Sequence, residues 1–227
     1  MDQMKRFAIY YAPEPGPFTD AAAAWLGWDL AQGAPTLQPA PDLPRPLAEV
    51  TAEPRKYGFH GTLKPPFRLA DGVTAAALAQ ATARLAASLA PLKLPGLQMV
   101  NLEGFLALTP MGDTAALQDL AAEVVRNLDP YRAALTSAEI ARRRPERLTP
   151  RQRDLLATYG YPYVMEQFQF HLTLSGPLGD DEVAVTAAAA QHFAGLIPQP
   201  FHIRDICLCG EDAAGHFHLL HRYALSA

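Results

Sequence analysis

The strongest constraint on the fold is a five-residue sequence that occurs twice. FHGTL occupies residues 59–63 and FHLTL occupies residues 170–174. In an extended segment alternate side chains share a face, so each histidine and threonine point one way and the apolar residues point the other. With seven histidines in 227 residues, roughly half of one His-x-[Ser/Thr] match is expected by chance. Two matches that share the flanking Phe and Leu therefore indicate two related strands.

The elements around the two motifs also follow one order. Each motif strand is followed by a short connection, an Ala-rich helix and two further strands. The helices are expected over 74–90 and 180–194, and the later strands end near Thr109 and Tyr223. Such self-similarity predicts two copies of one supersecondary unit. Two equivalent lobes packed side by side would bring the motifs together across a pseudo-twofold axis.

The rest of the chain supplies further elements. A strand is predicted over 5–13, and Thr19 is predicted to cap a helix that stops near Gly33. Residues 34–54 hold six prolines and are interpreted as a loop that could cover a cleft. Thr74 can cap the first Ala-rich helix.

Between the two repeats the sequence is helical. Thr114 is predicted to open a helix that ends at Leu128. Residues 129–160 form an Arg-rich helical insertion in which Thr149 and Pro150 begin a helix.

These elements predict one domain over 1–227. The lobe with the first motif is expected over about 14–110. The lobe with the second motif is expected over about 161–227, together with the N-terminal strand.

Composition narrows the class of protein. The chain is 49% hydrophobic and 19% charged, with a net charge of −4, which argues against binding long nucleic acid. No apolar run approaches the roughly 20 residues that cross a bilayer, and the N-terminus lacks the apolar core of a signal peptide. Cys207 and Cys209 are too close in sequence for a structural disulfide. We expect a cytoplasmic protein and leave its oligomeric state open.

The paired His-x-Thr motifs resemble the signature of the two-histidine (2H) phosphoesterase superfamily, which has one such motif per lobe. Six further segments are similar to a branch found beside carbon–phosphorus lyase genes and associated with phosphonate metabolism: RFAIYYAP, RKYGFHGTLKPPFRL, GFLALTP, YRAALTSAEIARR, GYPYVMEQFQFHLTL and HRYAL. The resemblance spans nearly the whole chain. It implies a bilobal α+β fold with antiparallel sheets around a central groove and helices outside.

The motif residues also suit phosphodiester chemistry. Opening a cyclic phosphodiester needs a base that deprotonates water and an acid that protonates the departing oxygen. Histidine, with an unperturbed pKa near ~6.5, serves either role at neutral pH. His60 and His171 are the catalytic candidates, and Thr62 and Thr173 can donate hydrogen bonds to the phosphoryl oxygens. The scheme needs no metal and no cofactor.

The expected function is hydrolysis of a small cyclic phosphodiester, such as a phosphoribosyl cyclic phosphate. One alternative is an RNA-end 2′,3′-cyclic phosphodiesterase or a 2′–5′ ligase-like enzyme. The other is a phosphate-ester-binding module without catalysis. Neither the roles of the two histidines nor the exact substrate follows from the sequence.

Several other residues are candidates for substrate binding. Tyr10 and Tyr11 are adjacent in a strand, so one faces each side and either could line the groove, while Lys64 could neutralise phosphate. Seven arginines lie between 132 and 153, and guanidinium groups bind oxyanions through a planar fork. In a protein of the phosphonate branch, Arg132, Arg142 and Arg143 could hold a second phosphate. Most of these arginines would otherwise form a solvated helical face.

Two features are expected to be structural. Tyr57 shares the parity of Phe59 rather than His60, which favours packing. His216 and His218 share a strand face but His221 does not, so these three form a poor metal site.

Overall fold

A seven-stranded antiparallel sheet dominates the computed structural model, which describes residues 3–227. The strand order is β11-β10-β1-β4-β8-β7-β6. The strands are β1 Arg6–Tyr11, β4 Gly61–Phe67, β6 Leu97–Leu102, β7 Phe105–Pro110, β8 Leu172–Pro177, β10 Asp205–Glu211 and β11 Phe217–Ala224. Two small antiparallel pairs stand apart from it: β2 Trp28–Asp29 with β3 Ala34–Pro35, and β5 Leu92–Leu94 with β9 Phe201–Ile203.

The sheet is divided where the two motif strands meet. β4 and β8 pair through Gly61 and Leu172 alone, whereas the strands on either side pair over several residues. The sheet therefore consists of two half-sheets, β11-β10-β1-β4 and β8-β7-β6. The predicted α+β class with two antiparallel lobes is confirmed, and each motif strand lies at the inner edge of its half-sheet.

Gly61 allows the two motif strands to approach each other. A Cβ atom added at Gly61 would lie 2.3 Å from the ring of Phe170, closer than any carbon contact tolerates. The first motif therefore has glycine where the second has Leu172, because the Phe170 ring occupies the space that a side chain would need.

The two repeats exchange their final hairpins. β6 and β7 follow the first motif in the chain but join the half-sheet of β8. β10 and β11 follow the second motif but join β1 and β4. The predicted grouping of these strands into lobes over 14–110 and 161–227 is therefore wrong. The segments that lead into the two hairpins pair with each other as β5 and β9. Long-range pairing of this kind leaves no local pattern in the sequence.

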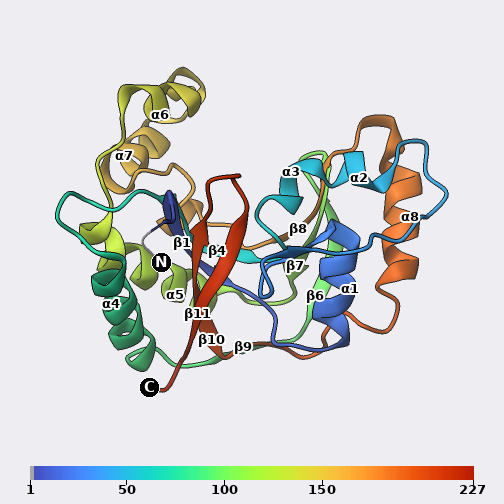
Figure 1. Cartoon of the computed structure of the whole chain (residues 1–227), viewed down its shortest axis with the longest axis horizontal. Coiled ribbons are helices and arrows are strands. Elements are labelled where there is room, and N and C mark those ends of the chain that lie inside the picture. The colour runs from blue at the N-terminus through green and yellow to red at the C-terminus, as the bar shows by residue number, and fades with distance from the viewer. Residues whose placement is uncertain (1–2) are drawn as a thin grey trace.

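Helices cover the two half-sheets separately. Figure 1 shows α4, α5, α6 and α7 on one side of the molecule and α1, α2, α3 and α8 on the other. The helices are α1 Pro17–Leu26, α2 Leu47–Val50, α3 Ala52–Arg55, α4 Ala75–Ala87, α5 Ala115–Leu128, α6 Ser137–Arg142, α7 Pro150–Tyr159 and α8 Glu182–His192. Short 3₁₀ turns occur at Asp129–Tyr131, Pro145–Arg147, Met165–Gln167 and Gly179–Asp181. No helix within residues 3–227 combines the length and apolar character needed to span a membrane.

Two predicted helix starts are confirmed by their caps. The Thr74 hydroxyl accepts a hydrogen bond from the Ala77 amide at the start of α4. Thr149 forms a capping box with Gln152 at the start of α7.

The first helix differs from its predicted bounds. α1 begins at Pro17, because proline suits the first helical turn, and the Thr19 hydroxyl donates instead to the Glu14 carbonyl. The helix ends at Gly27, whose φ of 81° closes it well before Gly33.

Candidate active site

The two motifs show the alternation that their sequences predict. His60, Thr62, His171 and Thr173 are half-buried on one face. The other three positions of each motif are buried in the core, where they hold each motif strand against the helices: Phe59, Gly61, Leu63, Phe170, Leu172 and Leu174. The core therefore fixes the face that carries each histidine and threonine.

Both histidines make the same backbone hydrogen bond. The Nδ1 atom of His60 lies 2.9 Å from the Gly58 carbonyl, and Nδ1 of His171 lies 2.9 Å from the Gln169 carbonyl. A carbonyl only accepts hydrogen bonds, so Nδ1 carries the proton in each neutral ring. The Nε2 atom of each ring is then left as the proton acceptor.

His60 lies in an aromatic environment. Its ring stacks on Tyr10 at 3.8 Å between centroids, with Tyr57 at 6.1 Å, and its Nε2 atom is 3.1 Å from the Thr62 hydroxyl. Burial lowers the pKa of His60 to about 4, with a smaller contribution in the same direction from the charge of His171. His60 is therefore neutral at neutral pH.

A cavity of about 240 Å³ is lined by one residue of each motif, and His171 and Thr62 are not among its lining residues. His60 lines it from the first motif and Thr173 from the second. Phe105, another lining residue, lies 5.7 Å from the His171 ring. The rest of the wall comes from α3, the turn before β4 and the end of β8: Glu53, Pro54, Tyr57, Gly58, Ser175, Gly176 and Pro177. An imidazole that accepts protons and a hydroxyl that donates hydrogen bonds thus face one space.

Residues 62–218 match the model of a family described as "Protein of unknown function (DUF1045)". The chain belongs to the DUF1045 family.

Two curated relatives carry the name "Ribose 1,5-bisphosphate phosphokinase PhnN". The protein from Janthinobacterium sp. (strain Marseille) is 37% identical over 222 residues, which cover 94% of this chain and 49% of that protein. The protein from Laribacter hongkongensis (strain HLHK9) is 35% identical over 214 residues, which cover 92% and 49% respectively. The DUF1045 chain therefore spans about half the length of these relatives.

Solved structures with a similar course of the backbone include LigT from E. coli complexed with NADP+. It is 15% identical, with 99% of each chain covered and a TM-score of 0.47. Another is TT0787 from Thermus thermophilus, which is 14% identical, with 97% of each chain covered and a TM-score of 0.46.

The two adjacent tyrosines of the DUF1045 chain face opposite sides of β1. Tyr10 lies beneath His60, whereas Tyr11 is buried in the main core against Phe170 and Phe201. The expectation that Tyr10 or Tyr11 could line the groove is wrong for both residues, because Tyr11 packs in the core and Tyr10 is fully buried beneath His60.

Tyr57 is a groove residue that alternation along the strand does not identify. It lines the cavity and stacks on Phe217 at 5.3 Å. Gly58 has a φ of 68° and ends the extended run before β4, so parity with Phe59 does not apply to Tyr57. Gly58, directly after Tyr57, is the sequence feature that indicates a break in the strand alternation at this point. Phe105 comes from the neighbouring strand β7 and has no such feature, whereas Ser175 lies in β8 two residues after Thr173, where strand alternation predicts the same face.

The cationic candidates of the DUF1045 chain lie in a second cavity, beside the helical insertion. Lys64, Arg132, Arg142 and Arg143 all line it. Lys64 is 1% exposed and lies 3.2 Å from an Asp129 carboxylate oxygen. Burial lowers the pKa of Lys64 to about 8, although Asp129 opposes the shift.

The histidines of the C-terminal hairpin make other contacts. His216 stacks on Trp28 at 4.4 Å, and Nε2 of His218 lies 2.8 Å from an Asp212 carboxylate oxygen. Residues 3–227 contain no cluster of three or more His, Cys, Asp or Glu side chains placed to hold a metal.

The Pro-rich segment contributes to the groove at its C-terminal end. Glu53 and Pro54 of α3 line the same cavity as His60 and Thr173. Further back, Arg45 pairs with Asp181 beside α8. Part of 34–54 is therefore helical and forms one wall of the site.

Proposed function

We propose that this chain hydrolyses a small cyclic phosphodiester, with His60 and His171 as the proton-transfer groups. The observation that carries the proposal is the matched backbone hydrogen bond of the two rings, combined with a shared cavity lined by His60 and Thr173. In the free protein the Thr62 hydroxyl donates to Nε2 of His60, so a bound substrate has to replace this hydrogen bond before Nε2 accepts a proton and Thr62 donates to a phosphoryl oxygen.

The reaction adds water to phosphorus and opens the ring. One histidine takes a proton from the attacking water while a new P–O bond forms. The P–O bond to one ring oxygen breaks, and the other histidine protonates that oxygen. Thr62 and Thr173 donate hydrogen bonds to the non-bridging oxygens, where negative charge grows as the attacking oxygen approaches.

His60 is the base in the direction of hydrolysis. A base must be unprotonated when substrate binds, and burial against Tyr10 keeps His60 neutral. His171 acts in its imidazolium form, in which Nε2 also carries a proton, and gives that proton to the leaving oxygen. The reverse reaction would exchange these roles.

The substrate class is a 5-phosphorylated ribose 1,2-cyclic phosphate. The name of the curated relatives contains ribose 1,5-bisphosphate. Breaking the bond between phosphorus and O2 of such a cyclic phosphate leaves phosphate on C1 and gives that compound. The net charge of −4 also favours a small substrate over RNA.

A panel of cyclic phosphates tests the proposal. The purified protein is incubated in EDTA with the 5-phosphorylated ribose 1,2-cyclic phosphate, its unphosphorylated analogue and nucleoside 2′,3′-cyclic phosphates, and products are identified by phosphorus NMR. We expect ring opening of the phosphorylated sugar. Faster opening of the nucleotides would favour an RNA-end enzyme, and binding without turnover would favour a binding module.

A further inference from the structure

The second cavity, beside the helical insertion, is strongly cationic. It has a volume of about 180 Å³ and lies among the ends of β1 and β4, α5 and the insertion. Six cationic side chains line it: Arg6, Lys64, Arg68, Arg132, Arg142 and Arg143. A concentration of positive charge on a chain of net charge −4 indicates an anionic ligand.

Carboxylates neutralise only part of this charge. Glu211 pairs with Arg6, Glu139 pairs with Arg68, and Asp129 is shared by Lys64 and Arg132. Three carboxylates therefore face six cations. In the described part of the chain, Arg142 and Arg143 form no ion pair with a carboxylate.

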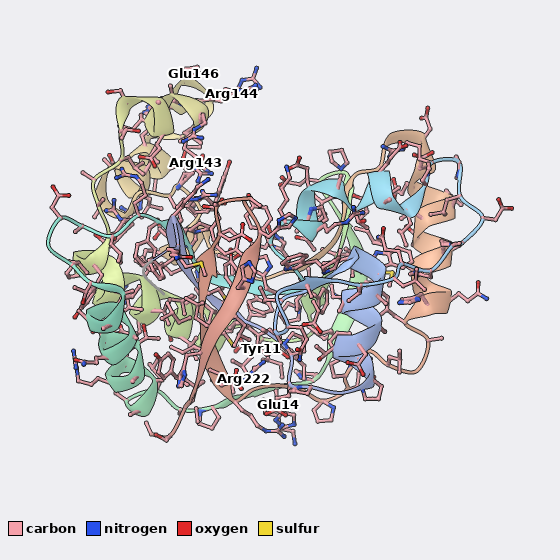
Figure 2. All side chains as sticks on the ribbon, in the orientation of Figure 1. Tyr11, Glu14, Arg143, Arg144, Glu146 and Arg222 are labelled. Atoms are coloured by element: carbon pink, nitrogen blue, oxygen red, sulfur yellow. The ribbon has the colours of Figure 1, made fainter. Side chains whose placement is uncertain are left out.

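The two unpaired arginines lie at the mouth of the cavity. Both are exposed at the end of α6 and line the cavity. The Arg143 guanidinium lies over the Tyr161 ring at 4.7 Å, which holds it in place while its edge stays available for hydrogen bonds. Figure 2 shows Arg143 on the inner side of the insertion, whereas Arg144 and Glu146 lie at its outer tip.

The insertion is tied to the sheet at this cavity. The Ala133 amide donates a 2.8 Å hydrogen bond to the Arg68 carbonyl, and Leu69 bridges to Arg132. The start of the insertion, with Arg132, is therefore held next to the end of β4.

The same two strands connect the cationic cavity with His60. β1 carries Tyr10, which stacks on His60, and begins at Arg6, while β4 carries Thr62 and then Lys64. At about 3.3 Å per residue, these separations correspond to about 7 to 13 Å. The two cavities therefore lie along the same pair of strands.

Tyr10 has a buried polar group beneath His60. Its hydroxyl is fully buried and has no hydrogen-bond partner within residues 3–227. The side chains of Arg6 and Tyr57 lie close enough to act on the pKa of Tyr10, which burial raises well above its usual value. Tyr10 is 0% exposed and lines neither cavity, so its side chain packs beneath the His60 ring and does not face a ligand.

From this geometry we infer that the cationic cavity binds a phosphate monoester carried by the substrate whose cyclic phosphate lies between His60 and His171. The position of the cyclic phosphate between the two histidines rests on the proposed function. Arg142 and Arg143 bind the monoester oxygens, because guanidinium groups match phosphate in a bidentate geometry. The paired cations behind them hold the cavity positive.

Kinetic measurements test this assignment with a charge-matched control. The double variant Arg142→Gln/Arg143→Gln removes two charges from the cavity, and Arg144→Gln/Arg147→Gln removes two from the same exposed insertion. We expect the first pair to lower kcat/KM at least about tenfold for the 5-phosphorylated sugar and less than about threefold for the unphosphorylated analogue. The second pair should change both by less than about threefold. Equal losses for both substrates would overturn the inference.

A binding measurement separates this inference from the proposed function. Ribose 5-phosphate has no cyclic phosphate, so its calorimetric binding should survive in His60→Ala/His171→Ala and weaken at least about tenfold in Arg142→Gln/Arg143→Gln, with ribose as the blank. If the wild type fails to bind it at millimolar concentration, the cavity assignment is wrong. If the histidine variants keep full turnover, the proposed function is wrong while the cavity assignment stands on the binding result.

A phosphate monoester can belong to a sugar phosphate or to a nucleotide, and nucleotide substrates distinguish these two sources. A 5′-phosphorylated nucleoside 2′,3′-cyclic phosphate is compared with its 5′-hydroxyl form in the same variants. If Arg142→Gln/Arg143→Gln lowers kcat/KM for the phosphorylated sugar but not for the phosphorylated nucleotide, the result supports a sugar phosphate. The reverse result overturns the sugar substrate and retains the monoester site.

Discussion

His60 lies flat against Tyr10 at 3.8 Å and its Nε2 atom contacts Thr62, whereas His171 has Phe105 beside it at a tilt, 5.7 Å away. The two rings share the same Nδ1 bond to the carbonyl two residues earlier. The backbone therefore fixes one tautomer in both neutral rings, and burial against Tyr10 lowers the pKa of His60. One sequence motif thus places two histidines in different surroundings.

The largest expected effect comes from removing either ring. His60→Ala and His171→Ala should each lower kcat by about 10²–10⁴ on a cyclic phosphate, because each ring transfers a proton in the transition state. A p-nitrophenyl phosphodiester needs little help for its leaving group. It should therefore restore His171→Ala much more than His60→Ala.

Stopped assays on both substrates measure this difference. Equal rescue of the two variants would remove the assignment of base and acid. Wild-type turnover by either variant on the cyclic phosphate would remove the two-histidine mechanism.

The threonines give the next largest effect. Thr62→Val and Thr173→Val keep the side-chain shape but lose a hydrogen bond to the phosphoryl oxygens, so each should lower kcat about a hundredfold. Thr62 also contacts His60 in the free protein, so its loss should additionally move the pH profile, and loss of Thr173 should not. Steady-state kinetics over a pH series check both statements. A change in KM alone would assign the hydroxyls to ground-state binding.

The pH dependence of kcat/KM tests the environment of His60. A pKa lowered to about 4 means that the ring stays neutral as the pH falls from 6.5 towards 4. Activity should hold between pH 7 and pH 5, whereas a histidine of pKa ~6.5 as base would lose about 30-fold at pH 5. Tyr10→Ala exposes the His60 ring, so the pH below which kcat/KM falls should rise. An acid limb near 6.5 in the wild type would contradict the proposed role of His60.

The smallest predicted effect concerns the joint between the two motif strands. Gly61→Ala places a methyl group where the Phe170 ring lies, so it should reduce the free energy of unfolding by about 1–3 kcal/mol. Phe170→Leu in the same chain should recover part of that loss by making room. Urea unfolding of the two single variants and the double variant measures the coupling. Additive losses would show that Gly61 and Phe170 are independent.

Local patterns predicted the motif strands and several helix starts correctly. The alternation of His60 and Thr62 with buried neighbours follows from strand geometry, and Thr74 and Thr149 cap their helices because side-chain oxygens satisfy the first free amides. These features depend on residues within a few positions of each other.

Features that depend on distant contacts were not predictable. In the hairpin exchange β5 pairs with β9, and no local pattern in either strand specifies its partner. Lys64 is buried because α5 brings Asp129 to it, and Arg6 reaches the cationic cavity only through the strand order. The arginine excess in the sequence indicated an anion site, but its walls come from four separate parts of the chain.

The exchanged hairpins also decide how the polypeptide can be divided. A break between α6 and α7 would leave β1, β4, β6 and β7 in one fragment and β8, β10 and β11 in the other. Each fragment would then expose a motif strand without the hairpin that completes its half-sheet. Coexpressed, the two pieces hold every strand and should reassemble as a noncovalent pair, so the insertion offers a natural place to split this protein into a complementation reporter.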